Sequence, residues 1–77
     1  MEIADFLIKF EGCFDEIELG TILPETQFRH LEKWDSLTAL TLLAMVDGDY
    51  EVAISANELR ACNKVSEVFD LIKQKKS

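Results

Sequence analysis

The sequence predicts an all-α fold: a small four-helix bundle with a long loop between the first and second helices and a short third helix. Two observations predict it. Apolar residues recur at helical spacing in separate stretches, and the one alternating stretch, Tyr50 to Ile54, has no partner strand. With 77 residues the chain is too short to divide, so we expect a single domain over residues 1–77 that buries about 60% of its unfolded surface.

The first helix is predicted over residues 3 to 14, where five apolar side chains repeat at helical spacing: Ile3, Phe6, Leu7, Phe10 and Phe14. From Asp15 to Trp34 the periodicity fades, and Gly20 and Pro24 mark a long loop with room for one helical turn. A connection of this length in so small a domain is more often functional or packed by its own side chains. Its expected anchors in the core are Ile22, Leu23, Phe28 and Leu31.

The second helix is predicted from Ser36 to about Val46, with Asp35 as its N-cap and Asp47-Gly48-Asp49 as its end. Its inner stripe is expected to comprise Leu37, Leu40, Leu43 and Ala44, widened by Leu42, Met45 and Val46. A stripe of this width predicts burial on more than one side.

Two further helices are predicted in the C-terminal part of the chain. Ser55 and Glu58 have the spacing of a capping box, which begins a short third helix ending near Ala61. Asn63 is expected to cap the fourth helix, whose apolar residues repeat at helical spacing: Val65, Val68, Phe69 and Ile72. Lysines gather in its last turn, where cations suit the negative end of the helix dipole: Lys73, Lys75 and Lys76.

The composition indicates a folded, acidic protein. Apolar residues make up 48% and charged residues 30% of the chain, which suits a hydrophobic core better than a disordered segment. The formal charge of −7 repels nucleic acids and anionic membranes and favours partners with basic patches. We expect a monomer that has no nucleic-acid or membrane partner.

Cysteine usage and the chain ends indicate a cytoplasmic, reduced protein. Cys13 and Cys62 lie far apart and His30 is the sole histidine, so neither a zinc site nor a disulfide framework is indicated. The first residues carry acids where a signal peptide carries bases, and no apolar run approaches about 18 residues. Met1 and the lysine-rich end favour a stand-alone protein over a domain of a larger one.

Ser36 is the residue best placed for a function, at the N-terminal end of an amphipathic helix. As a nucleophile it needs a general base, and the only imidazole, His30, is expected in a loop upstream. The chain also lacks a glycine-rich phosphate loop and an HExxH helix. The sequence therefore argues against catalysis, whereas the unpaired amides and positive dipole end of a helix N-terminus suit a phosphate attached to Ser36.

The residues around Ser36 resemble the acyl carrier protein family. Asp35-Ser36-Leu37 lies near the middle of a short chain, Thr26-Gln27-Phe28 and Trp34 precede it, and the resemblance extends over nearly the whole chain. It implies a non-catalytic four-helix carrier whose Ser36 receives 4'-phosphopantetheine from coenzyme A through a phosphopantetheinyl transferase. The arm then holds an acyl or aminoacyl group as a thioester, supplied and removed by enzymes with basic or apolar docking patches.

The same resemblance implies roles for further residues. Asp35 and Leu37 become part of the surface that the transferase recognises. An apolar channel for the acyl chain would be lined by Leu40, Ile54, Leu59, Cys62 and Val68.

One departure from the family pattern concerns partner recognition. Carriers of general fatty acid synthesis have acids two and five residues after the serine, whereas this chain has Thr38 and Thr41 there. Together with Met45, these two residues are expected to take part in transferase and partner recognition. We therefore expect the exposed front of the second helix to be neutral. The acids gather later, at Asp47, Asp49, Glu51, Glu58 and Glu67. This pattern favours a specialised biosynthetic pathway, for a lipid, a polyketide or a related product, over general fatty acid synthesis.

Two other functions stay open. A degenerate EF-hand-like calcium-binding protein is one, because five residues fall at positions 1, 3, 5, 8 and 12 of a calcium loop: Asp47, Asp49, Glu51, Ile54 and Glu58. Against it, position 6 holds Val52 where the loop requires glycine. A helical adaptor without a prosthetic group is the other, and it predicts that Ser36→Ala leaves function intact.

Overall fold

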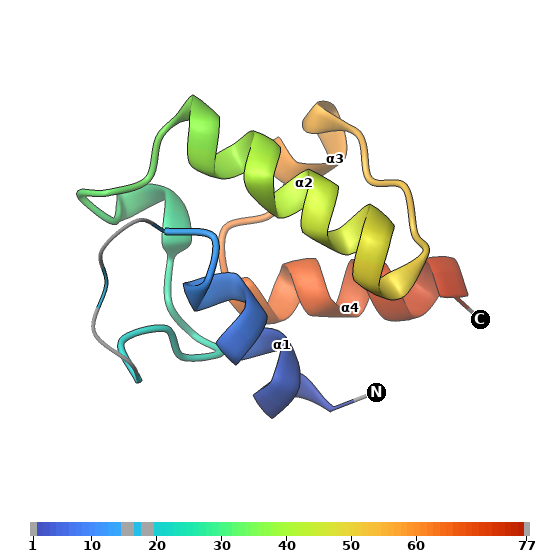
Figure 1. Cartoon of the computed structure of the whole chain (residues 1–77), viewed down its shortest axis with the longest axis horizontal. Helices are drawn as coiled ribbons and strands as arrows, with labels where there is room; N and C mark the ends of the chain where they lie inside the picture. The colour runs from blue at the N-terminus through green and yellow to red at the C-terminus, as the bar shows by residue number, and fades with distance from the viewer. Residues whose placement is uncertain (1, 15–16, 18–19, 77) are drawn as a thin grey trace.

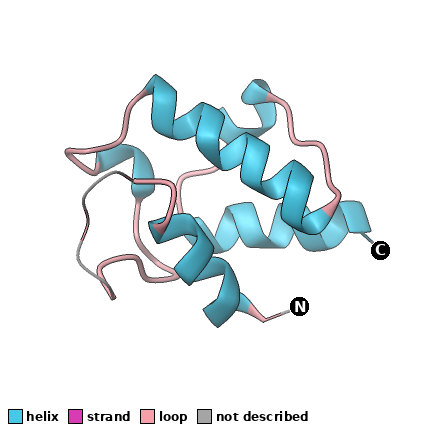
Figure 2. Ribbon diagram, in the orientation of Figure 1, coloured by secondary structure: helices cyan, strands magenta, loops and turns pink. Residues whose placement is uncertain are grey.

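The computed structural model describes residues 2–14, 17 and 20–76, and within them it confirms the all-helical architecture. These residues form four α-helices and one short 3-10 helix: α1 (Ile3–Glu11), η1 (Phe28–His30), α2 (Ser36–Tyr50), α3 (Ala56–Arg60) and α4 (Val65–Lys76). Figure 1 shows α2 crossing above α1 and α4, with the short α3 beside it. The described residues 20–35, which lead into α2, fold along one side of the bundle (Figure 2).

Helix α1 is shorter than predicted, ending at Glu11 instead of residue 14. The chain then turns tightly, because the amides of Cys13 and Phe14 bond to the carbonyls of Phe10 and Glu11, each at 3.1 Å. This turn keeps Phe14 buried although it lies outside the helix. The predicted apolar stripe is thus correct at Phe14, but the helix that was expected to carry it stops earlier.

An aromatic cluster joins α1, η1 and the segment before α2. Phe10 lies edge-on to Phe28 at a ring-centroid distance of 5.6 Å, and Trp34 lies edge-on to Phe28 at 4.8 Å. Such pairs are favourable beyond their buried area. The cluster fixes the long connection against α1 just before α2 begins, and it holds the Trp34 indole next to the start of that helix.

The predicted helical turn in the long connection is confirmed as η1, and two of the four predicted anchors are buried there. Ile22 and Phe28 are in the core, Leu31 is half-buried, and Leu23 is exposed. The connection also reaches α4, because the carbonyls of Thr26 and Pro24 accept the amides of Val65 and Ser66 at 3.0 and 2.8 Å. These bonds satisfy amides that every helix leaves unpaired in its first turn.

Helix α2 extends beyond the predicted end, through Asp47-Gly48-Asp49 to Tyr50. The buried Tyr50 packs edge-on against Phe6 of α1, which stabilises the last turn. Glu51 then ends the helix in a left-handed conformation, with φ 57° and ψ 39°. The expectation that the Asp-Gly-Asp sequence stops the helix was wrong because core packing of Tyr50 overrides the low helix propensity of those residues.

The predicted inner stripe of α2 was wrong at three of its four positions, whereas two of the residues expected to widen it, Leu42 and Val46, are buried. Leu37 and Leu40 are 67% and 64% exposed, and Ala44 is exposed as well. The buried stripe consists of Thr38, Leu42, Val46 and Tyr50, flanked by half-buried Ala39, Leu43 and Met45. Because α2 carries apolar residues all round, its periodicity does not select one face, and packing against the rest of the bundle does.

The capping box predicted for α3 is confirmed. Ser55 Oγ accepts the Glu58 amide at 3.1 Å, and the Glu58 carboxylate accepts the Ser55 amide at 3.0 Å. The cap predicted for α4 was wrong, because Asn63 Oδ1 instead accepts a hydrogen bond from Arg29. The Glu67 carboxylate accepts the amides of Asn63 and Lys64, both at 2.7 Å, and so caps α4 from within its first turn.

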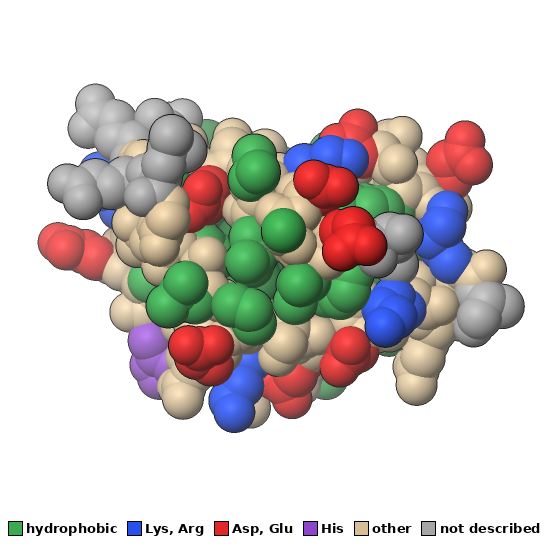
Figure 3. All heavy atoms as spheres, turned by 90° about the horizontal axis from the view of Figure 1, so that it is seen from below, with side chains coloured by type: hydrophobic (Ala, Val, Ile, Leu, Met, Phe, Trp, Pro, Cys, Tyr) green, Lys and Arg blue, Asp and Glu red, His purple; other side chains and the backbone are tan. Residues whose placement is uncertain are grey.

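Figure 3 shows the face on which α1 and α4 lie, with hydrophobic side chains gathered between acidic and basic ones. Ile8 of α1 is among the large apolar residues exposed to solvent. No helix in the described part of the chain is long and apolar enough to cross a membrane.

Candidate functional site

Ser36 is the first residue of α2, and its side chain is exposed. Asp35 precedes it in an extended conformation and caps the helix: its Oδ1 accepts the Thr38 amide and the Thr38 hydroxyl, each at 2.8 Å. The hydrogen bond from the Thr38 amide, reinforced by the Thr38 hydroxyl, holds the pKa of Asp35 below its ordinary value. The ionised form of Asp35 is therefore favoured, and it caps the first turn of α2 next to Ser36.

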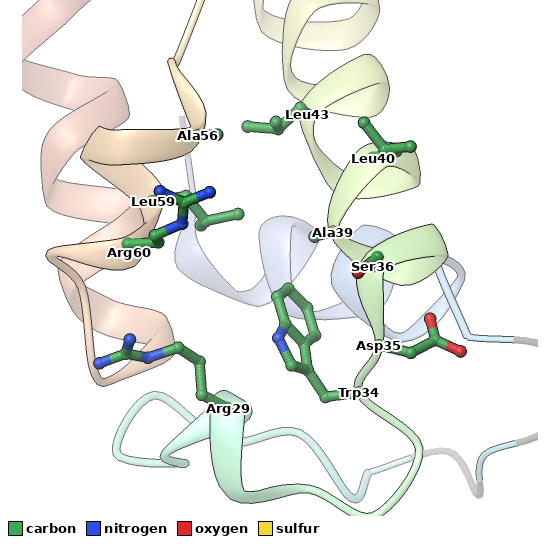
Figure 4. A pocket seen from close by; sticks show the side chains of 10 residues that line it. All are labelled: Arg29, Trp34, Asp35, Ser36, Ala39, Leu40, Leu43, Ala56, Leu59 and Arg60. Carbon is green, nitrogen blue, oxygen red and sulfur yellow. The ribbon is translucent and has the colours of Figure 1, made fainter.

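A pocket of about 470 Å³ lies beside Ser36, between α2 and α3. From α2 it is lined by Ser36, Ala39, Leu40 and Leu43, which follow one another at helical spacing along one face. Ala56 and Leu59 of α3 form the opposite wall. In Figure 4 the Ser36 hydroxyl points toward the space between the two helices, whereas the Asp35 carboxylate points the opposite way.

The two ends of the pocket carry other side chains. Trp34 closes it at the end nearest Ser36, with its indole held by Phe28 of the aromatic cluster. Arg29 from η1 and Arg60 from α3 also line it. The site is therefore mainly apolar, its polar lining residues are Ser36, Asp35 and the two arginines, and its volume is within the range of small-molecule pockets.

Two of the five residues predicted for an acyl channel line this pocket, Leu40 and Leu59. The other three, Ile54, Cys62 and Val68, are buried but are not among its lining residues. Cys62 lines a different depression, between α3 and α4. The structure therefore brings together only part of the predicted channel.

The predicted recognition residues lie on different sides of α2. Leu37 and Thr41 are exposed, and the Thr41 hydroxyl donates to the Leu37 carbonyl at 2.9 Å. Thr38 is only 6% exposed, so its predicted place on the exposed front was wrong. Its hydroxyl is instead satisfied by Asp35. Met45, the last of the predicted recognition residues, is half-buried.

Nucleophilic chemistry finds no support in the arrangement of the described residues. His30 is exposed in η1 and does not line the Ser36 pocket. Burial, with a smaller contribution from Asp49, raises the pKa of the Cys13 thiol to about 11, and burial also raises the pKa of Cys62. Both thiols are therefore protonated at neutral pH and are poor nucleophiles.

The calcium loop considered from the sequence does not form. Asp47 and Asp49 lie within α2, and Asp49 pairs with Lys9 at 3.7 Å. Glu58 belongs to the capping box of α3 and pairs with Lys75 at 2.9 Å. Among the residues that the structure describes, no three His, Cys, Asp or Glu side chains are grouped so that they could hold a metal ion.

Sequence reasoning did not identify Trp34, Arg29 and Arg60 as parts of the site. The α2 wall could have been found by counting from Ser36, because residues three, four and seven positions later share its face. The contributions of η1 and α3 depend on how the chain folds back. No local pattern marks them.

No protein-family model matches the chain, and no curated protein matches it in sequence. Among solved structures, the chain resembles a small helical bundle of the acyl carrier class. That structure is the solution NMR structure of the holo acyl carrier protein from Geobacter metallireducens, with a TM-score of 0.77 and 23% sequence identity. The match covers 95% of this chain and 83% of that chain. It establishes that the chain has the acyl carrier protein fold, as the resemblance implied.

Proposed function

We propose that this protein is an acyl carrier protein, with a 4'-phosphopantetheine arm attached to Ser36. The observation that carries the proposal is the position of Ser36: it is exposed at the start of α2 and faces a mainly apolar pocket, within the acyl carrier fold. A carrier needs an accessible attachment point beside a surface that shelters an acyl chain. The chain itself supplies no catalysis.

The residues present fit the group. Attachment forms a bond between Ser36 Oγ and the phosphorus next to pantetheine in coenzyme A, breaks the pyrophosphate bond, and releases adenosine 3',5'-bisphosphate. The serine proton passes to a base of the transferase. The positive end of the α2 dipole then stabilises the phosphodiester, because anions are favoured at helix N-termini. When attached, the arm supplies a thiol that carries an acyl or aminoacyl group as a thioester.

Other residues near Ser36 have roles in binding and recognition under this proposal. Asp35 and Leu37 flank the attachment point, and the exposed side of α2 also carries Thr41. We assign this surface to the transferase and to acyl-handling enzymes. Leu40 and Leu59, on opposite walls of the pocket, are the residues that we assign to contact with the acyl chain.

The test is a mass measurement. The purified protein is incubated with coenzyme A and a broad-specificity phosphopantetheinyl transferase, and the intact mass is recorded. We expect the gain of one phosphopantetheine in the wild type and none in Ser36→Ala. The matched control is Ser66→Ala, which removes a serine from the first turn of another helix, α4, and should be modified as the wild type is.

The absence of a mass gain in the wild type would be informative. If the wild type gains no mass with several transferases while a known carrier in the same tube is modified, the carrier proposal is overturned. The helical adaptor then becomes the better hypothesis, because it needs no prosthetic group.

A further inference from the structure

The Ser36 pocket contains positive charge that a neutral acyl chain does not require. The chain has a net charge of −7, yet both of its arginines, Arg29 and Arg60, line this one pocket. The remaining walls are mainly leucine, alanine and tryptophan. A guanidinium group at the edge of an apolar pocket indicates a ligand that combines an apolar part with an anionic part.

The two arginines differ in what their guanidinium groups do. Arg29 donates to Asn63, and Figure 4 shows its head bent away from Ser36, so mainly its stem faces the pocket. Arg60 donates to the side-chain oxygen of Asn57 at 3.1 Å, within the same helix. Both Arg60 and Leu59 line the pocket from α3, and in Figure 4 the head of Arg60 lies on the side of α3 that faces α2. Because Asn57 is a neutral amide, this bond does not neutralise the charge of Arg60.

The carboxylate that lines the pocket is bonded to another residue and is not directed toward Arg60. Asp35 is the one carboxylate among the lining residues, and both bonds described above tie it to Thr38. In Figure 4 its carboxylate points away from α3. The positive charge of Arg60 therefore faces the apolar pocket without an acidic lining residue directed toward it.

We propose that the cargo of this pocket is an acyl group that bears a free carboxylate, such as a half-thioester of a dicarboxylic acid. This inference rests on the carrier function proposed above. The methylene part of the cargo contacts Leu40, Leu43 and Leu59, and the carboxylate pairs with Arg60. Arginine suits this task because its planar fork of donors matches the two oxygens of a carboxylate.

The experiment compares two cargoes of the same carbon number that differ at the far end. Wild type and Arg60→Gln are loaded at Ser36 with glutaryl or pentanoyl arms from the corresponding coenzyme A thioesters. Cleavage of each thioester by hydroxylamine is timed at low salt. Each rate is divided by the rate for the same coenzyme A thioester free in solution, which removes the difference in intrinsic reactivity.

We expect the wild type to protect the glutaryl thioester about two- to fivefold more than the pentanoyl thioester, the range for a solvent-exposed ion pair. The preference should be lost in Arg60→Gln. It should also be lost in about 1 M salt, where the screening length falls to roughly 3 Å. Lys64→Gln removes the same charge from a residue that does not line this pocket, and it should keep the preference.

The other outcomes separate a failure of the cargo proposal from a failure of the carrier proposal. Equal protection of both cargoes in the wild type, or an unchanged preference in Arg60→Gln, overturns the anionic cargo while leaving the carrier function intact. Failure of Ser36 to accept either arm overturns the carrier function, and the cargo assignment with it. The fluorescence of Trp34, the sole tryptophan, reports independently whether the glutaryl arm occupies the pocket.

Discussion

Glu11 is a buried carboxylate that holds the long connection in place. Its side chain is 5% exposed, and its Oε2 accepts the amides of Gly20 and Ile22 at 2.8 and 3.1 Å. Gly20 has a φ of 86°, a conformation that glycine adopts without strain. A single side chain at the end of α1 thus satisfies two backbone donors of the connection that leads to the Ser36 site.

Replacing Glu11 should destabilise the protein strongly. Glu11→Ala leaves two amides without their partner, and a hydrogen bond to a charged group contributes roughly 1.5–3 kcal/mol. We expect the free energy of unfolding in urea at pH 7 to fall by about 2–4 kcal/mol. Glu25→Ala, at an exposed position of the same connection, is the control and should change it by less than about 0.5 kcal/mol.

Glu11→Gln distinguishes the hydrogen bonds from the charge. It keeps an oxygen that accepts both amides, so it should retain more stability than Glu11→Ala. Equal losses for the two variants would show that the carboxylate charge, and not its geometry, stabilises the connection. If Glu11→Ala were as stable as the wild type, the proposed role of Glu11 would be contradicted.

At the scale of elements, carboxylates cap three of the helices. Asp35 caps α2, Glu58 completes the capping box of α3, and Glu67 accepts two amides at the start of α4. The amides of Thr38, Ser55 and Lys64, respectively, are the main cause that lowers the pKa of each carboxylate. Each folded pKa therefore lies below its unfolded value.

The lowered pKa values of these carboxylates predict that the folded protein loses stability in acid. As the pH falls below about 5, the unfolded chain takes up protons before the native caps do, so acidification favours unfolding. The melting temperature of the wild type should exceed that of Glu67→Gln at pH 7. The difference should shrink as the pH falls through the folded pKa of Glu67 and disappear once the caps are protonated.

The comparison uses melting curves followed by circular dichroism between about pH 7 and pH 3. Glu32→Gln is the control, because it makes the same charge change at an exposed residue that lies outside the helices. A difference between wild type and Glu67→Gln that grows toward low pH would contradict the prediction.

The helices show which caps can be predicted from the sequence and which cannot. Ser55 and Glu58 were predicted as a capping box because both partners lie within one turn. The cap of α4 was misassigned because Asn63 is a good N-cap residue locally, but Arg29 from a distant part of the chain binds its side chain. Thr38 was expected to be exposed, since nothing local shows that it faces the core.

For the whole molecule, the feature that bears on the proposed docking of partner enzymes is the surface charge pattern beside Ser36. No charged residue occurs from Ser36 to Val46, and the exposed residues of this stretch include Leu37, Leu40 and Thr41. Basic docking patches gain little from such a surface, because they need complementary charge. We propose on this ground that the partners of the carrier present apolar surfaces and belong to a specialised pathway.

The loaded protein should therefore be a poor substrate for purified enzymes of general fatty acid synthesis. Thr41→Glu places an acid on the exposed side of α2, and we expect it to raise the elongation rate about two- to fivefold through one added surface ion pair. Ala53 is exposed beyond the end of α2, and Ala53→Glu is a control that adds the same charge away from Ser36. Elongation of the wild type at the rate of a general carrier would contradict the specialised role.

The sequence by itself determined the helical class and the helix starts at Ser36 and Ala56, because these depend on apolar spacing and on caps within one turn. The tertiary structure alone decided which face of α2 is buried, that Glu11 anchors the long connection, and that Arg60 faces the Ser36 pocket. Those features are contacts between residues distant in sequence, and they form only when α1, α2 and α3 pack around one core.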